Sequence, residues 1–382
     1  MKLNLHLFYK IIKSIFFSSY TTVLCLLFLS VLVLWGTLYQ IDNGIYAAKE
    51  RFFNSWFILI KGIIPFPGLR IIGLLLIVNL FLMFFKRNYS VKNIGLTIGH
   101  LGIFIFLIGG AIISYTAKEM FLSLYEGNSS NMASSYTQWE IAIWTNNNTS
   151  TNKSNNITLF TDTITPGLIY SLPFLNSSIK ISRYYKNCLQ PFMSEFNNMQ
   201  LSNYQQYQNK IEPLETSRDP SDNLPCAEIE FIKNDTVVQN ISLFGAISSP
   251  TYIYFLNDTI WFLLQRKKIQ LPVNITLIDF IKENYPQTQM AKQYKSIIKV
   301  VADDLNREAV ISMNKPFRYK NYTFYQASFY QNKGIESSTF AIVENKGKWL
   351  PYISGAFMFL GFSIHFIIKL FTYIKKQKQE KL

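Results

Sequence analysis

Long uncharged apolar runs alternate with polar stretches along this chain, and they predict its membrane-spanning helices. A helix needs roughly 20 apolar residues to cross a bilayer core about 30 Å thick. Runs that meet or approach this length predict four spans, at residues 14–41, 71–85, 93–117 and 349–368. The second run has only 15 residues, so it needs help from the residues before it or from a thinned bilayer.

The region between the third and fourth runs, residues 118–348, has a different pattern that predicts strands. Segments such as AEIEFIK, KSIIKVV and STFAIV alternate apolar and polar residues or carry β-branched residues, between Asn, Asp, Gly and Pro. The run VVADDLNREAVISM predicts two strands joined by a polar turn. We expect a β-sandwich or paired sheets, with a solvated loop at 145–156 and a helical turn or two at 201–210.

Residues 42–70 combine charged residues at 49–51 with several aromatic residues. This mixture predicts a helix and loop at the outer membrane interface, with the apolar face toward the lipid. Pro65, Pro67 and Gly68 would then turn the chain back into the second span. The fold class that we expect is therefore a multi-pass α-helical membrane protein with four transmembrane helices. A large β-rich extracytoplasmic domain would lie between the third and fourth helices.

The distribution of charge predicts the orientation of the spans. The chain has 37 Lys and Arg against 23 Asp and Glu, a net charge of +14, yet only 16% of its residues are charged. Most of the excess lies in a leader (1–13), a loop (86–92) and a tail (369–382). Four spans put all three on the cytoplasmic side, as the positive-inside rule requires. The charge is thus a topological signal, and we expect a lipid bilayer and no nucleic acid as partner.

Three histidines are the first candidates for chemistry. His6 in the leader is expected to be idle, and His365 lies near the cytoplasmic end of the fourth span, where it can face head groups. His100 lies about two turns into the third span, roughly 10 Å deep. An ionisable side chain at that depth is costly and indicates a functional site.

The neighbours of His100 leave two interpretations open. Gly95, Gly99 and Gly102 recur at helical spacing, so one face of the helix has no side chains. This face could pack closely against another helix, with the imidazole bonded to a neighbour. Alternatively, a flat ligand or a partner helix could lie against it, with His100 as an axial haem ligand.

The cysteines and the known catalytic motifs add little. Cys188 and Cys226 both fall in the β-rich region, where they could form a disulfide or remain two unrelated thiols. The chain has no CxxCH, Walker loop, HExxH or nucleophile elbow. It therefore has no complete active site of its own, and whether it is part of an enzyme is left open at this point.

Several segments together resemble the ResB family of cytochrome c biogenesis proteins. They are WGTLYQIDNGIYAAKERFFNSWF (35–57) followed by PFPG (65–68), GHLGIFIFLIGGAI (99–112) and KSIIKVVADD…AVISMNKPFRYKNYTFYQASFY (295–330). The resemblance extends over both ends of the chain and the membrane topology. The middle, about 130 to 270, has no matching motif.

The resemblance implies a subunit of the system II cytochrome c synthetase, a haem lyase complex of the bacterial cytoplasmic membrane. With a CcsA/ResC-type partner, such a subunit carries haem b across the membrane and supports its attachment to apocytochrome c. His100 matches the family's haem ligand within the membrane, and the second ligand would come from the partner. A thiol-reducing, thioredoxin-like protein is a further implied partner.

One other function is compatible with parts of the sequence, and a third is not. The chain could be a membrane-anchored binding or sensory protein whose outer β domain docks a partner, with a purely structural His100. A transporter is not supported, because the spans have no paired charges or broken inverted repeats.

Overall fold

The computed structural model describes residues 16–86, 90–145, 156–161, 164–175, 177–190, 211–255, 258–288, 291–332 and 334–380. The chain divides into two compact units. We call the first the helical unit, which comprises Met1–Lys118, Tyr319–Tyr322 and Glu344–Leu382. The second is the β-rich unit, which comprises Glu119–Arg318 and Thr323–Val343. The predicted helical turn at 201–210 and most of the predicted loop at 145–156 lie outside the described residues.

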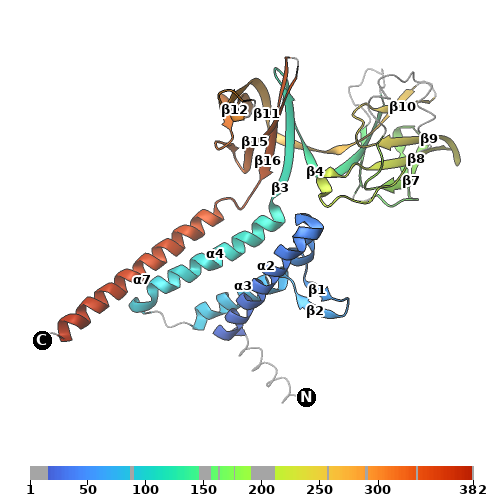
Figure 1. Ribbon diagram of the computed structural model, residues 1–382. Helices are drawn as coiled ribbons and strands as arrows, with labels where there is room; N and C mark the ends of the chain where they lie inside the picture. The colour runs from blue at the N-terminus through green and yellow to red at the C-terminus, as the bar shows by residue number, and fades with distance from the viewer. Residues whose placement is uncertain are drawn as a thin grey trace. The chain divides into compact units, whose positions relative to one another are not determined.

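The helical unit holds every long helix that the structure describes (Figure 1). Its helices are α2 (Ser19–Ala48), η1 (Lys49–Phe53), α3 (Leu69–Lys86), η2 (Val91–Asn93), α4 (Ile94–Thr116) and α7 (Leu350–Glu380). Three helical segments are long and apolar enough to cross a membrane: Ser19–Phe53, Val91–Thr116 and Leu350–Glu380. Two precede the β-rich unit in the sequence and one follows it, so the predicted class of a multi-pass membrane protein is confirmed.

The predicted number of four transmembrane helices is wrong. The second apolar run forms α3, whose apolar part, Leu69–Phe85, is shorter than the other three. At about 1.5 Å per residue it is roughly 26 Å long, less than the bilayer core of about 30 Å. The helix cannot begin earlier, because Pro67 ends a strand and the N–H of Gly68 donates to the carbonyl of Trp56 at 2.8 Å.

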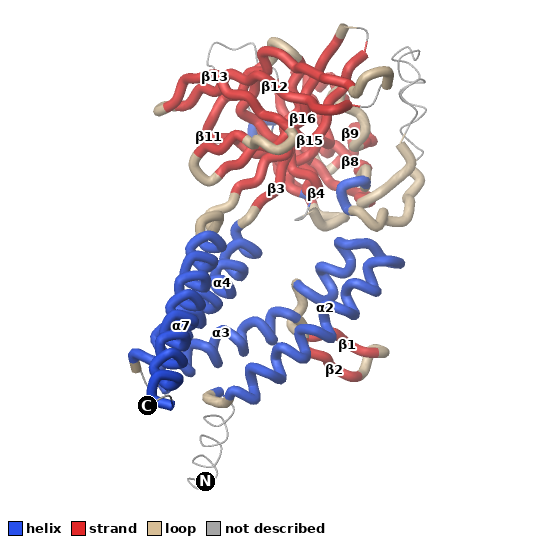
Figure 2. The backbone as a smooth tube through the Cα atoms, turned by 60° about the vertical axis from the view of Figure 1, so that its left-hand side comes forward, coloured by secondary structure: helices blue, strands red, loops and turns tan. Residues whose placement is uncertain are grey.

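A β-hairpin that we did not predict precedes α3 (Figure 2). Gly44 breaks α2 with φ 81° and ψ 163°, so the helix changes direction there. Strand β1 (Phe57–Ile60) then pairs with β2 (Ile64–Pro67). Lys61 and Gly62 both have positive φ at the turn, as tight hairpins require.

The β-rich unit contains two antiparallel sheets. Its strands are β3 (Lys118–Tyr125), β4 (Ser129–Thr145), β5 (Asn156–Phe160), β6 (Ile169–Leu172), β7 (Ser177–Tyr185), β8 (Cys226–Lys233), β9 (Thr236–Phe244), β10 (Thr251–Phe255), β11 (Asp258–Asn284), β12 (Ala291–Ala302), β13 (Leu305–Ser312), β14 (Phe317–Tyr319), β15 (Tyr322–Asn332) and β16 (Ile335–Glu344). The larger sheet has the order β13-β12-β11-β4-β3-β16-β15-β14, with β10 beside β11 and β5 beside β4. The smaller sheet has the order β6-β7-β8-β9. Two short helical turns, η4 (Pro173–Leu175) and η6 (Pro220–Asp222), lie between strands.

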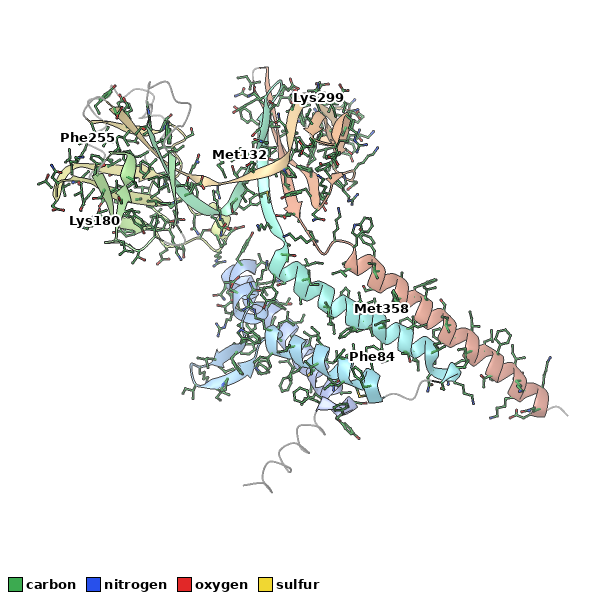
Figure 3. The ribbon with its side chains drawn as sticks, turned by 180° about the vertical axis from the view of Figure 1, so that it is seen from behind. Phe84, Met132, Lys180, Phe255, Lys299 and Met358 are labelled. Carbon is green, nitrogen blue, oxygen red and sulfur yellow. A yellow bond between two sulfur atoms is a disulfide. The ribbon has the colours of Figure 1, made fainter. Side chains whose placement is uncertain are left out.

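Two unusually long strands connect two lobes of this unit. One half of β4 and of β11 packs against the smaller sheet around Ile143, Phe231 and Phe262, which are fully buried. The other half of β11 pairs with β12 in the second lobe. Figure 3 shows Met132 of β4 between the lobe that carries Lys180 and the lobe that carries Lys299. The expectation of paired sheets between two membrane helices is therefore confirmed.

A hydrogen-bonded polar cluster lies inside the second lobe. Ser296 of β12 donates to Oε1 of Gln326 in β15 at 2.7 Å, and Nε2 of Gln326 donates to Ser338 of β16 at 2.6 Å. The two serine hydroxyls are themselves 2.6 Å apart, and both serines are fully buried. A buried polar network is stable only when its members satisfy one another. The cluster thus links three strands that are not all neighbours in the sheet.

We predict that Gln326→Leu lowers the free energy of unfolding by about 2 kcal/mol, because both serines lose their amide partner. The measurement is thermal unfolding of the purified full-length chain in detergent. Gln331→Leu is the control, since Gln331 lies exposed on the same strand, and its effect should stay within about 0.5 kcal/mol. Equal melting temperatures for the two variants would contradict the prediction.

Candidate functional site

His100 lies on α4, and its ring is held by the helix's own backbone. Its Nδ1 atom is 2.6 Å from the carbonyl oxygen of Leu96, one turn earlier. A carbonyl can only accept a hydrogen bond, so we assign the proton to Nδ1 and the lone pair to Nε2. This is the form in which an imidazole binds iron, with the other ring nitrogen bonded to a carbonyl.

His100 lines a cavity of about 470 Å³ among three helices. The lining residues are Ser19, Thr22 and Val23 of α2, Asn79, Leu80, Met83 and Phe84 of α3, and His100 of α4. This volume lies within the range of small-molecule sites, which combine apolar walls with a few placed polar groups. Figure 3 shows α4 between α3, which carries Phe84, and α7, which carries Met358. The tautomer of His100 and the largely apolar walls both suit a haem.

Asn79 is a further residue of this cavity that we did not predict. It is almost fully buried, and its Oδ1 accepts from Thr22 at 2.6 Å. Its Nδ2 donates to the carbonyls of Phe16 at 2.8 Å and Ser18 at 3.1 Å. Asn79 therefore fixes the start of α2 against α3 at the cavity wall. The sequence signal was present as one amide in the run IIGLLLIVNLFLMFF, since a polar group in such a run needs partners.

Two of the three glycines on this face of α4 pack closely against α7. A Cβ built on Gly95 would lie 2.7 Å from the carbonyl oxygen of Gly361 in α7. A Cβ on Gly102 would lie 2.8 Å from the backbone nitrogen of Met358. Of the two interpretations, close helix packing therefore holds for Gly95 and Gly102, whereas no described atom outside the helix's own backbone lies within 4 Å of a Cβ built on Gly99. The cavity of His100 lies instead on the side of α2 and α3.

The other histidines are not part of this cavity. His365 lies on α7, where its backbone contacts Gly95. Its Nδ1 is buried and has no hydrogen-bond partner among the residues that the structure describes. His6 falls outside the described residues. In the part of the chain that the structure describes, no group of three or more His, Cys, Asp or Glu could hold a metal ion.

The helices and the β-rich unit define the class of protein, and a family comparison narrows it. The chain is a multi-pass membrane protein with a large β-rich region between its second and third membrane helices. Residues 260–348 match the model of the ResB-like family, which confirms the resemblance over that segment. The match implies a role in system II cytochrome c biogenesis. No curated protein matches the chain.

The matched segment runs from within β11 through β16 and ends shortly before α7, and it includes the buried polar cluster. His100 and its cavity precede it in the sequence. The family match and the histidine cavity are therefore two separate observations.

Proposed function

We propose that this protein is the ResB-type subunit of the system II cytochrome c synthetase. With a CcsA/ResC-type partner, it would carry haem b across the membrane and support its covalent attachment to apocytochrome c. The match of residues 260–348 to the ResB-like family carries this proposal. The cavity with a ligand-competent histidine between membrane helices supports it independently.

The helix packing supports an orientation with the β-rich unit on the outer face. Gly95, at the start of α4, lies beside His365 in the middle of α7, and Gly109, later in α4, lies beside Leu350 at the start of α7, so these helices are antiparallel. The bond between Thr22 and Asn79 places the start of α2 at the end of α3. The starts of α2 and α4 and the later parts of α3 and α7 therefore lie toward one end of the helical unit. In the sequence these segments adjoin or contain the three basic clusters at 1–13, 86–92 and 369–382, so we assign this end to the cytoplasm, with the shorter α3 returning the chain between α2 and α4.

This orientation places His100 near the side where haem is made. His100 is six residues after Ile94, about 9 Å along α4 from the cytoplasmic end. The β-rich unit continues from the opposite ends of α4 and α7, through Ala117 and residues 345–349. The disulfide between Cys188 and Cys226 agrees with an oxidising outer compartment.

In this proposal each residue of the cavity has a physical task. Leu96 holds the proton of His100 on Nδ1, so that Nε2 can bind the iron of the transported haem. Asn79 and Thr22 hold the cavity wall in place through their mutual hydrogen bond. Leu80, Met83 and Phe84 supply apolar walls that exclude water from the macrocycle. The reaction at the apocytochrome thiols would take place at groups of the partner.

The test is the absorption spectrum of the protein purified together with its CcsA-type partner. We expect His100→Ala to lose most of the haem Soret band and cytochrome c assembly, with partial recovery of the band when imidazole is added. His365→Ala is the matched control, because it removes the other membrane histidine and should keep the band. A His100→Ala protein that retains full haem content and assembles cytochrome c normally refutes the proposal.

A different result would favour the alternative of a membrane-anchored binding or sensory protein. That function predicts a complex without pigment and full tolerance of His100→Phe, since the ring would only pack between helices.

A further inference from the structure

A second cavity of about 390 Å³ lies in the helical unit, and it shares no residue with the cavity of His100. Its walls are apolar side chains of α3 and α4: Leu69, Leu74, Ile77, Phe106, Leu107 and Ala111. Gly73 and Gly110 also line it, and no atom lies within 4 Å of a Cβ built on either glycine. These two glycines thus face open space, unlike Gly95 and Gly102, which contact α7.

Arg70 is the one charged residue among the described residues that line this cavity. Its guanidinium lies 5.7 Å from the centre of the Tyr115 ring. Among the described residues, no carboxylate forms an ion pair with it and no hydrogen bond to it is formed. A cation in apolar surroundings is costly without a counter-charge. Arg70 also lies in the first turn of α3, where the helix dipole opposes a cation and favours an anion.

The cavity has a polar end and an apolar end. The rings of Phe81 and Phe104 stack 5.9 Å apart, so α3 and α4 run antiparallel and bring Arg70 to the level of Tyr115. Tyr115 is the residue before the end of α4. From there the apolar walls continue to Phe106, about 13 Å along the helix. Tyr115 and Trp56, which also lines the cavity, are residue types that concentrate at the level of lipid head groups.

We propose that this cavity binds an anionic amphiphile. A carboxylate or phosphate would pair with Arg70, and the apolar body would lie in the groove between α3 and α4. Two molecules have this chemistry here, an anionic phospholipid and a haem, whose propionates are carboxylates. Binding of an anionic phospholipid does not depend on the proposed function. Binding of haem rests on the proposed function and adds a second haem position, about 22 Å along α4 from His100.

The phospholipid arm uses the full-length chain in nanodiscs of phosphatidylcholine and phosphatidylglycerol. Native mass spectrometry of the protein released from the nanodiscs would measure the phosphatidylglycerol that remains bound to it. We expect Arg70→Gln to reduce it by about tenfold, because a charge-assisted pair is lost. Arg51→Gln is the matched control, since the guanidinium of Arg51 also lies on an aromatic ring, that of Tyr39, but does not line the cavity.

A second pair of variants tests the cavity without changing charge. Gly110→Leu should fill the open space and reduce bound phosphatidylglycerol to a similar extent. Gly355→Leu is its control, because Gly355 is also a helical glycine with nothing within 4 Å of its built Cβ, but lies on α7 outside the cavity. Both glycine variants should fold, so a selective loss in Gly110→Leu reports on the cavity.

The haem arm uses the complex with the partner in a His100→Ala background. Haem that remains bound there should be lost when Arg70→Gln is added, and not when Arg51→Gln is added. Dependence of either ligand on Arg70 and Gly110 supports the inference. If neither phosphatidylglycerol nor residual haem depends on them, the inference is overturned. If only the proposed haem function is wrong, the wild-type complex will have no pigment, but the wild-type chain will still retain phosphatidylglycerol through Arg70.

Discussion

Gly361→Leu is expected to separate α4 from α7 and to prevent the helical unit from folding normally. A Cβ built on Gly361 would lie 2.7 Å from both the carbonyl oxygen of Gly95 and the Cα of Gly99. Both are backbone atoms, so no side-chain rotation can relieve the overlap. Helices in membranes associate largely through close packing at small residues, because lipid provides no hydrophobic drive between them. The variant thus removes the main interaction of this helix pair.

The expected loss in stability is more than about 3 kcal/mol, larger than ordinary overpacking because the helix axes must move apart. The measurement is the melting temperature of the full-length chain in detergent, with the fraction of monodisperse protein. Gly355→Leu adds the same side chain to the same helix in open space and should change neither quantity substantially. Similar melting temperatures for both variants would show that the close approach of α4 and α7 is dispensable.

The sequence predicted most of the strands, because each shows its own periodicity. KSIIKVVADD and AVISM form β12 and β13 with the expected turn at Asp303 and Asp304. The sequence could not indicate that residues 258–284 form one strand that belongs to both lobes of the β-rich unit. That run contains QRKK and a proline, which read locally as an interruption. Only the pairing of its two halves with β4 and β12 makes the strand continuous.

In the helical unit, too, local sequence patterns did not predict the whole structure. Apolar length identified the three membrane helices but also predicted a fourth at 71–85, because it could not predict the hairpin of β1 and β2 that makes α3 begin at Leu69. The signal was the Lys61–Gly62 pair between FILI and IIPFP, a tight-turn sequence between two apolar runs.

The candidate site was predicted only in part, because some of its contacts join residues far apart in the sequence. Depth in a helix made His100 a candidate, and the structure places it in a cavity. The periodicity of Gly95, Gly99 and Gly102 revealed a bare face but carried no information about what covers it. Asn79 was missed because its partners lie more than 50 residues away in the sequence. Long-range partners follow from the packing of α2 on α3, which no local pattern specifies.

Removing the disulfide between Cys188 and Cys226 is expected to destabilise the β-rich unit strongly. The sequence left open whether these cysteines pair, and the structure bonds them, with Cα atoms 6.2 Å apart and a sequence separation of 38. A bridge that closes a loop of this length restricts the unfolded chain and stabilises the fold by about 4 kcal/mol in the chain-entropy account. Cys226 begins β8 and is fully buried beside Phe244, so the bridge anchors the end of a core strand.

The experiment compares the wild type with the double variant Cys188→Ser/Cys226→Ser. We expect a large fall in the melting temperature of the full-length protein in detergent, and a similar fall when the wild type is reduced. Thiol labelling of the denatured protein provides the control. Of the three cysteines, only Cys25 should react before reduction, and all three after it. Labelling of all three without reductant would contradict the bridge, and an unchanged melting temperature in the double variant would show that it contributes little to stability.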